Sequence, residues 1–173
     1  MIVIPPRFFH KDIRLPASEY VGTKSFFITL CSARRRPLFT NSHLAFDLLQ
    51  LLRNQAVERS FDIHAYCLMP DHLHFLAQGT QWDCDLRDFV KIFRLNSSRS
   101  HKQETGQPLW QKKYFDRILR SGCSMNSVAW YIWMNPVRKG LASSVGEYPF
   151  CGSFTDVEML RKEPAEAWKP GWK

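Results

Sequence analysis

The stretch Tyr66-Cys67-Leu68-Met69-Pro70-Asp71-His72-Leu73-His74-Phe75-Leu76-Ala77 holds two histidines, two residues apart, in an otherwise apolar run. Alternate residues of a β-strand point to the same face of the sheet. If 72–77 is a strand, His72 and His74 project side by side, while Leu73 and Phe75 face a core. Two imidazoles fixed on one face make half of a metal site. The rest of the chain would have to supply the other half.

The segments around this stretch alternate between strand-like and helix-like patterns. Segments rich in aromatic and β-branched residues predict strands at 24–32, 61–68, 72–78 and within 109–119. Apolar residues at helical spacing predict helices at 43–59, from 86 to about 95, and at 125–134. This order predicts an α+β fold of the ferredoxin-like β-α-β-β-α-β plan with an added C-terminal helix.

Local signals set the expected ends of these elements. Ser42 is a good N-cap for the first helix, and Ser124 for the third. The polar run at 96–100 is expected to end the second helix, which leaves 101–108 as a loop. Pro136 ends the third helix at or near residue 135, because a residue before proline is pushed out of the α region.

Length and composition predict one globular domain. The chain has 173 residues, of which 45% are hydrophobic and 14% aromatic, which is enough for a real core. We expect an N-terminal arm at 1–23, the main domain at 24–150 and a mixed-charge tail at 151–173. No apolar run approaches the roughly 20 residues of a membrane span, and the start does not resemble a signal peptide. A cytoplasmic, nucleoid-associated protein is therefore expected.

The five cysteines form no C-x-x-C pair, and an odd number cannot all pair with one another. This argues against a zinc ribbon or a disulfide framework and fits a reducing compartment.

The charge balance predicts a polyanionic partner. Lysine and arginine number 24 against 16 aspartates and glutamates, which gives a formal net charge of +8. Nucleic acid is the first expectation, although composition alone does not separate DNA from RNA or from an anionic membrane surface. The basic residues that we expect to contact phosphates, in whole or in part, are Arg34, Arg35, Arg36, Arg94, Arg99, Lys112, Lys113, Arg117, Arg120, Arg138 and Lys139. For each of them a solvated charge is the alternative.

The third helix offers a way to complete the histidine site. Tyr131 and Asn135 are four residues apart, so they are neighbours on one helical face. An amide oxygen can ligate a hard cation, and a phenol can attack a phosphate that the same cation holds. The alternatives are an aromatic residue packed between Trp130 and Trp133, and an asparagine that only ends the helix before proline.

Pro70-Asp71-His72-Leu73-His74, followed by the stretch from Tyr131 to Gly140 (YIWMNPVRKG), resembles the single-tyrosine HUH transposases, in which two histidines flank a hydrophobic residue. The resemblance is closest to the REP-associated tyrosine transposases and covers about residues 20–150. It implies that His72, His74 and Asn135 are metal ligands, that Tyr131 is the nucleophile, and that the ion is Mg²⁺ or Mn²⁺.

The resemblance further implies a substrate of single-stranded DNA beside a palindromic hairpin, cleaved through a 5′-phosphotyrosine. Because imidazoles suit Mn²⁺ better than Mg²⁺, stronger activity or binding is expected with Mn²⁺. A monomer is favoured over a dimer. Two alternatives remain open: a domesticated hairpin-binding protein that no longer cleaves, and an HUH nickase of the replication-initiator or relaxase kind.

Three positions stand apart from this pattern. Arg117 occupies a place where relatives often have histidine, so a catalytic role there is in doubt, although phosphate contact remains open. Asp71 is expected to form the turn, with a place beside the metal as the alternative. His64, on the preceding strand, is the further histidine to locate relative to the site.

Overall fold

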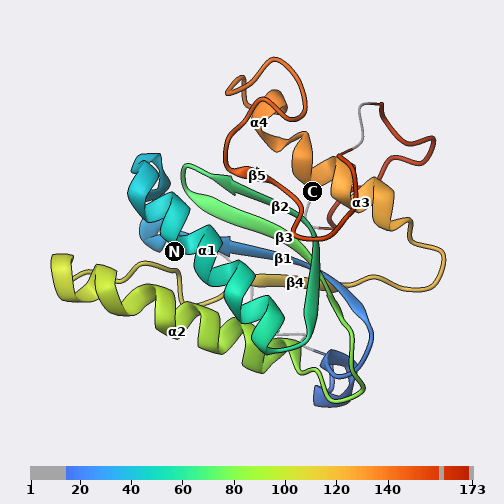
Figure 1. Ribbon diagram of the computed structural model, residues 1–173, viewed down its shortest axis with the longest axis horizontal. Coiled ribbons are helices and arrows are strands. Elements are labelled where there is room, and N and C mark those ends of the chain that lie inside the picture. The colour runs from blue at the N-terminus through green and yellow to red at the C-terminus, as the bar shows by residue number, and fades with distance from the viewer. Residues whose placement is uncertain (1–14, 160–161, 172–173) are drawn as a thin grey trace, which may run out of the picture.

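The computed structural model describes residues 15–159 and 162–171, and its central element is a five-stranded antiparallel sheet. The strands are β1 (Ser25–Cys31), β2 (Phe61–Met69), β3 (His72–Gly79), β4 (Phe115–Ile118) and β5 (Cys151–Gly152), in the order β4-β1-β3-β2-β5. Figure 1 shows this sheet with helices on both sides. The predicted α+β class is confirmed, with the expected element order as far as the third helix, whereas the last short helix and β5 were not predicted.

The helices are α1 (Ser42–Glu58), α2 (Leu86–Thr105), α3 (Met125–Trp133) and the short α4 (Asn135–Arg138). Short 3-10 turns lie at Ala17–Tyr20, Ala33–Arg35 and Leu38–Thr40. No helix among the described residues is both long enough and apolar enough to cross a membrane.

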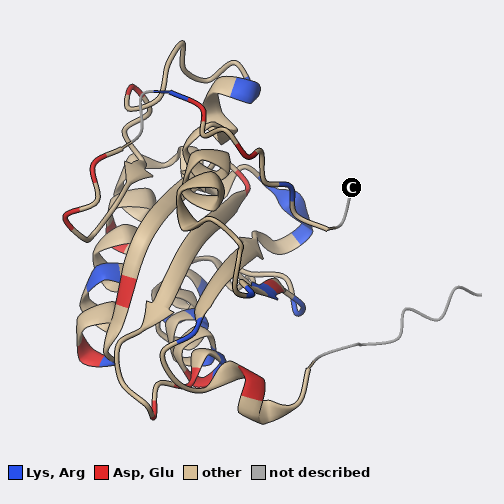
Figure 2. Ribbon diagram, turned by 90° about the vertical axis from the view of Figure 1, so that its right-hand side faces the viewer, with Lys and Arg blue, Asp and Glu red and all other residues tan. Residues whose placement is uncertain are grey.

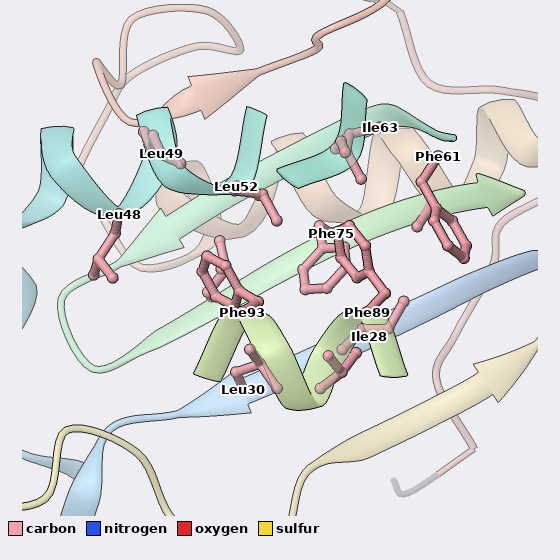
Figure 3. Close-up of a cluster of buried hydrophobic side chains, with 14 of the residues drawn as sticks. Ile28, Leu30, Leu48, Leu49, Leu52, Phe61, Ile63, Phe75, Phe89 and Phe93 are labelled. Carbon is pink, nitrogen blue, oxygen red and sulfur yellow. The ribbon is translucent and has the colours of Figure 1, made fainter. Parts of the chain in front are cut away.

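The two faces of the sheet carry separate apolar clusters. Because side chains alternate along a strand, Phe26 and Ile28 of β1 face α1 and α2, while Phe27 faces α3. Figure 3 shows the larger cluster, in which Phe75 of β3 meets Phe89 and other side chains of α1 and α2. The sheet is therefore covered on both sides, and the histidine face is the one that carries α3.

Two expected helix ends differ from the structure. The side chain of Asn41, not Ser42, accepts a hydrogen bond from the first turn of α1. The segment 101–108 is not all loop, because α2 continues to Thr105 and ends at Gly106, whose φ of 67° suits glycine. The polar run inside α2 is tolerated because one side of this helix is exposed, while Ser97 bonds the carbonyl of Phe93.

Pro136 does interrupt the helix as expected. Helix α3 ends at Trp133, and the chain then turns into α4, with the proline at its start where a missing N–H costs nothing. The Ser124 side chain caps α3 by accepting from the Ser127 amide, as predicted.

Parts of the predicted arm and of the predicted tail pack on the domain. Tyr20 of the arm is buried, and its hydroxyl donates to Asp116 of β4 at 2.7 Å. The strand β5 lies just beyond residue 150 and pairs with β2.

Candidate active site

His72 and His74 lie side by side on β3, as the strand alternation predicted. Their ring centroids are 4.5 Å apart. The antiparallel pairing of β1 with β3 places Thr29 directly opposite His74. The turn at 70–71, which joins β2 to β3, brings Asp71 next to His72.

Each imidazole is held through its Nδ1 atom. His74 Nδ1 is 2.8 Å from the Thr29 hydroxyl, and His72 Nδ1 is 2.5 Å from a carboxylate oxygen of Asp71. The Asp71 carboxylate accepts from Nδ1–H of His72, which leaves the lone pair of Nε2 for a metal ion. The Thr29 hydroxyl can accept from Nδ1–H of His74 in the same way, and that tautomer also leaves Nε2 for a metal ion. Asp71 is therefore more than a turn former, because it orients a candidate ligand.

The local environment favours the neutral form of both imidazoles. Burial lowers the pKa of His72, although the Asp71 carboxylate opposes this shift. Burial lowers the pKa of His74 further, and the positive charges of His72, Arg138 and Arg35 act in the same direction. Neutral imidazole is the form that binds metal ions.

Tyr131 lies beside this pair, because α3 packs across β2 and β3. Its ring centroid is 6.1 Å from that of His74 and 5.9 Å from that of Phe27. The guanidinium of Arg138 lies over the Tyr131 ring, 4.5 Å from the centroid. Burial raises the pKa of the Tyr131 phenol, and the charge of Arg138 counteracts that rise.

Asn135 is buried, and its amide group has a fixed orientation. Its Nδ2 donates to the carbonyls of Tyr131 at 2.9 Å and Ile132 at 3.2 Å. With both amide hydrogens directed at the helix, the amide oxygen is the atom left for a cation. None of the other described residues hydrogen-bonds to this oxygen.

The Asn135 amide oxygen is the candidate third donor beside the two imidazoles. No three His, Cys, Asp or Glu side chains within the described ranges form a group that could hold a metal. The two imidazoles with the Asn135 amide oxygen give two nitrogen donors and one oxygen donor. Such a mixed set suits Mn²⁺, and less well Mg²⁺, which prefers oxygen.

The basic residues selected from the sequence fall into separate places. Arg138 ends α4 and Lys139 follows it, both near the histidines, and Arg35 reaches Asp71 at 3.3 Å. Arg34 and Arg35 both have positive φ, near 57°, a strained conformation for non-glycine residues that is often retained at functional sites. Arg34 is exposed, while Arg36 is partly buried.

The remaining predicted phosphate contacts lie farther along the chain. Arg94 and Lys112 line a groove beside α2, and Arg99 is exposed on the same helix. Lys113, Arg117 and Arg120 are exposed on and around β4. His64 is not at the site, because it lies at the other end of β2, where its Nε2 is 2.9 Å from Gln78 Oε1.

The tail contributes a contact that the sequence did not indicate. The Trp168 ring lies 5.1 Å from Tyr131 and 4.8 Å from Phe27, centroid to centroid. Arg117 holds this segment in place by donating to the Lys169 carbonyl at 3.0 Å and by lying over the Trp168 ring. A tryptophan so distant in sequence gives no spacing signal that would connect it to Tyr131.

Comparison with known families agrees with this arrangement, in which a helix that carries a tyrosine packs over a pair of histidines on an antiparallel sheet. The family model described as "Transposase IS200 like" matches residues 22–135, which runs from before β1 to Asn135. The chain belongs to this transposase family.

Within the family, the similar proteins are REP-associated tyrosine transposases, which confirms the resemblance seen in the sequence. The one from Escherichia coli (strain K12) is 23% identical over 142 residues, covering 80% of this chain and 81% of that protein. A second relative, from Haemophilus influenzae (strain ATCC 51907 / DSM 11121 / KW20 / Rd), is named "Putative REP-associated tyrosine transposase". It is 26% identical over 125 residues, which cover 65% of this chain and 66% of that protein.

A solved structure has the same fold. It is a REP-associated tyrosine transposase bound to a REP hairpin, with a TM-score of 0.63 and 22% sequence identity. The alignment covers 76% of this chain and 78% of that one.

Proposed function

We propose that this chain is a metal-dependent nuclease and transposase, which cleaves and rejoins single-stranded DNA beside a palindromic hairpin. The observation that carries the proposal is the position of Tyr131, whose ring lies against His74 on the face that carries both imidazoles. Each imidazole is held through Nδ1, and no described residue hydrogen-bonds to either Nε2. Family membership favours a transposase over a replication initiator or relaxase. The hairpin is proposed because a protein of the same fold is bound to one.

The chemistry follows from the groups at the site. When bound by His72, His74 and Asn135, a divalent ion would neutralise phosphate charge and polarise the scissile group. The Tyr131 oxygen attacks phosphorus, its proton leaves to solvent or a base, and the P–O3′ bond breaks. The products are a 5′-phosphotyrosine and a free 3′-OH, which takes up a proton.

The covalent intermediate explains how strands can be rejoined. The phosphoester bond to Tyr131 conserves the energy of the broken phosphodiester, so a later attack by a 3′-OH on the same phosphorus reseals DNA without ATP. Because burial raises the pKa of the phenol, deprotonation needs help. The Arg138 guanidinium stabilises the phenolate and the metal ion would add to that effect.

The proposal is tested by incubating the protein with Mn²⁺ and a labelled oligonucleotide that carries a hairpin with single-stranded flanks. Wild type should give discrete cleavage products, with Mg²⁺ less effective and excess chelator inhibitory. Tyr131→Phe should give none. Tight binding by wild type without any cleavage would instead support the hairpin-binding alternative.

A further inference from the structure

A second basic region lies on α2, on the face of the sheet opposite His72 and His74. A groove of about 840 Å³ runs between one side of α2 and the segment 106–114. Its α2 wall repeats at intervals of three and four residues, through Arg87, Lys91, Arg94, Leu95, Ser98 and Lys102. Such intervals place side chains on one side of a helix. Among the described residues that line the groove, none is acidic.

The floor of this α2 groove is apolar and firmly packed. Leu109 and Trp110 are buried beneath it, while Leu95 remains 58% exposed. The Trp110 indole donates to the Ser97 hydroxyl at 2.8 Å, and its ring packs on Phe39. A rigid floor with charged rims suits a polyanion that has apolar as well as charged surface.

The charges on the rims are only partly balanced. Arg87 is paired with Asp85 at 3.0 Å, and Arg94 is anchored by donating to the Gln111 carbonyl. Lys91, Lys102 and Lys112 are exposed and form no ion pair with a described carboxylate. The groove therefore presents an uncompensated positive surface.

Arg87 and Lys102 are fifteen residues apart, or about 22 Å along a straight helix. Over that length one strand of DNA carries about six phosphates. Helix α2 holds its basic side chains in a straight row. Such a row fits the regularly spaced phosphates of a DNA duplex better than those of a flexible single strand.

The groove is connected to the candidate active site around one edge of the sheet. The segment that carries Lys112 continues into β4, which is the edge strand next to β1. From β4, Arg117 reaches the opposite face, where it lies over Trp168 beside Tyr131. Figure 2 shows that lysines and arginines lie mainly on the helices and connections around the sheet, while the central strands are almost free of charge.

We infer that the α2 groove binds the phosphate backbone of the double-stranded stem of the DNA substrate, while the single-stranded flank passes around β4 to Tyr131. This inference rests on the proposed function for the second half of the path. The β-sheet separates the groove from the candidate active site. A single DNA strand bound at Tyr131 therefore does not also occupy the groove. An acidic peptide is the rival occupant.

The double variant Lys91→Glu/Lys102→Glu tests the inference, because both side chains are exposed and the fold should persist. The probe is a fluorescent DNA hairpin without flanks, titrated at several salt concentrations. The variant should bind this stem about tenfold or more weakly near 0.1 M salt, and its slope of log affinity against log salt should fall by about two. Arg53→Glu/Lys162→Glu makes the same change in net charge outside the groove and should retain wild-type binding.

Stem binding by the groove variant that equals that of the control variant would overturn the inference. So would a loss confined to a linear, unpaired oligonucleotide. A poly-glutamate peptide that binds wild type but not the groove variant, and that displaces no hairpin DNA, would also overturn it. Cleavage of the hairpin oligonucleotide with single-stranded flanks, at saturating concentration, separates the two proposals. The groove variant should retain it, whereas its absence in wild type would contradict the nuclease and leave the stem measurement standing.

Discussion

His74 is buried and held by contacts on several sides within the proposed metal site. It is 3% exposed, its Nδ1 is held by Thr29, and its ring lies between those of Phe27 and His72. The alternation of β3 was enough to predict that the two histidines share a face. The role of Thr29 was not predictable, because the register between β1 and β3 depends on packing between segments over 40 residues apart in sequence.

Replacing Thr29 with valine should weaken metal binding. Valine has nearly the same shape but leaves Nδ1 of the buried His74 without its hydrogen-bond partner, so the ring loses the contact that orients it. We expect Mn²⁺ affinity to fall about 10- to 100-fold, as for other groups that orient metal ligands. Titration calorimetry with Mn²⁺ measures this.

Thr29→Ser is the matched control, because it keeps the hydroxyl and should bind Mn²⁺ nearly as wild type does. Equal affinities for the valine variant and wild type would show that Thr29 does not orient His74.

The buried His74 also makes stability depend on pH. Its pKa in the folded protein lies well below the ordinary value near 6.5. As the pH falls below about 6.5, this histidine binds a proton in the unfolded chain but not yet in the folded protein. The free energy of unfolding therefore falls as the pH is lowered through this range. Between pH 7.5 and 5.5 the contribution of His74 should amount to about 1 kcal/mol.

Urea denaturation of wild type and His74→Gln at the two pH values tests this sign. The variant should lose less stability than wild type over the same interval. An equal loss would mean that other groups, such as His72, account for the whole dependence.

At the scale of elements, Phe27 of β1 connects the sheet to α3 and the tail. It is fully buried and packs against His74, Tyr131, Trp168 and Phe115. Phe27→Ala should lower the free energy of unfolding by about 3–5 kcal/mol, because it removes a large buried ring. Chemical denaturation measures the loss.

Val57→Ala on α1 is a suitable control for Phe27→Ala, because Val57 is 78% exposed and should change stability by about 0.5 kcal/mol or less. A loss of the same small size for Phe27→Ala would show that this contact is not part of the core.

Element patterns were predictable where periodicity is strong, as in β1, β3, α1 and α3. The C-terminal half of α2 was missed, because its Asn and Ser residues resemble a helix end unless the buried Ser97 and His101 are known. The packing of α3 across the histidine strand was not deducible either, since no local signal in 125–135 specifies which face of the sheet it covers. That contact is what brings Tyr131 to His74.

For the whole molecule, the two faces of the sheet carry different properties. One face holds the two histidines, Tyr131 and the basic end of α4, and the other holds the basic groove of α2. The net charge of +8 predicted a polyanionic partner, but composition could not distribute that charge over two surfaces.

Tyr131 lies next to the His74 of its own chain, so the proposed site needs no tyrosine from a second copy. We therefore expect the protein to act as a monomer. Light scattering coupled to size-exclusion chromatography should give the mass of one chain, with and without hairpin DNA. Mixtures of Tyr131→Phe and His74→Gln chains should also stay inactive, whereas restored cleavage would indicate exchange of tyrosines between subunits.

The central claim is that Tyr131 attacks a phosphate held at the histidine pair. The most direct measurement is mass spectrometry of the denatured protein after reaction with Mn²⁺ and a 3′-labelled hairpin oligonucleotide. The 5′-phosphate of the labelled fragment should be found on the peptide that contains Tyr131, in wild type and in the control Tyr148→Phe, and not in Tyr131→Phe or with excess chelator. An adduct on another residue, or one that survives Tyr131→Phe, would contradict the claim.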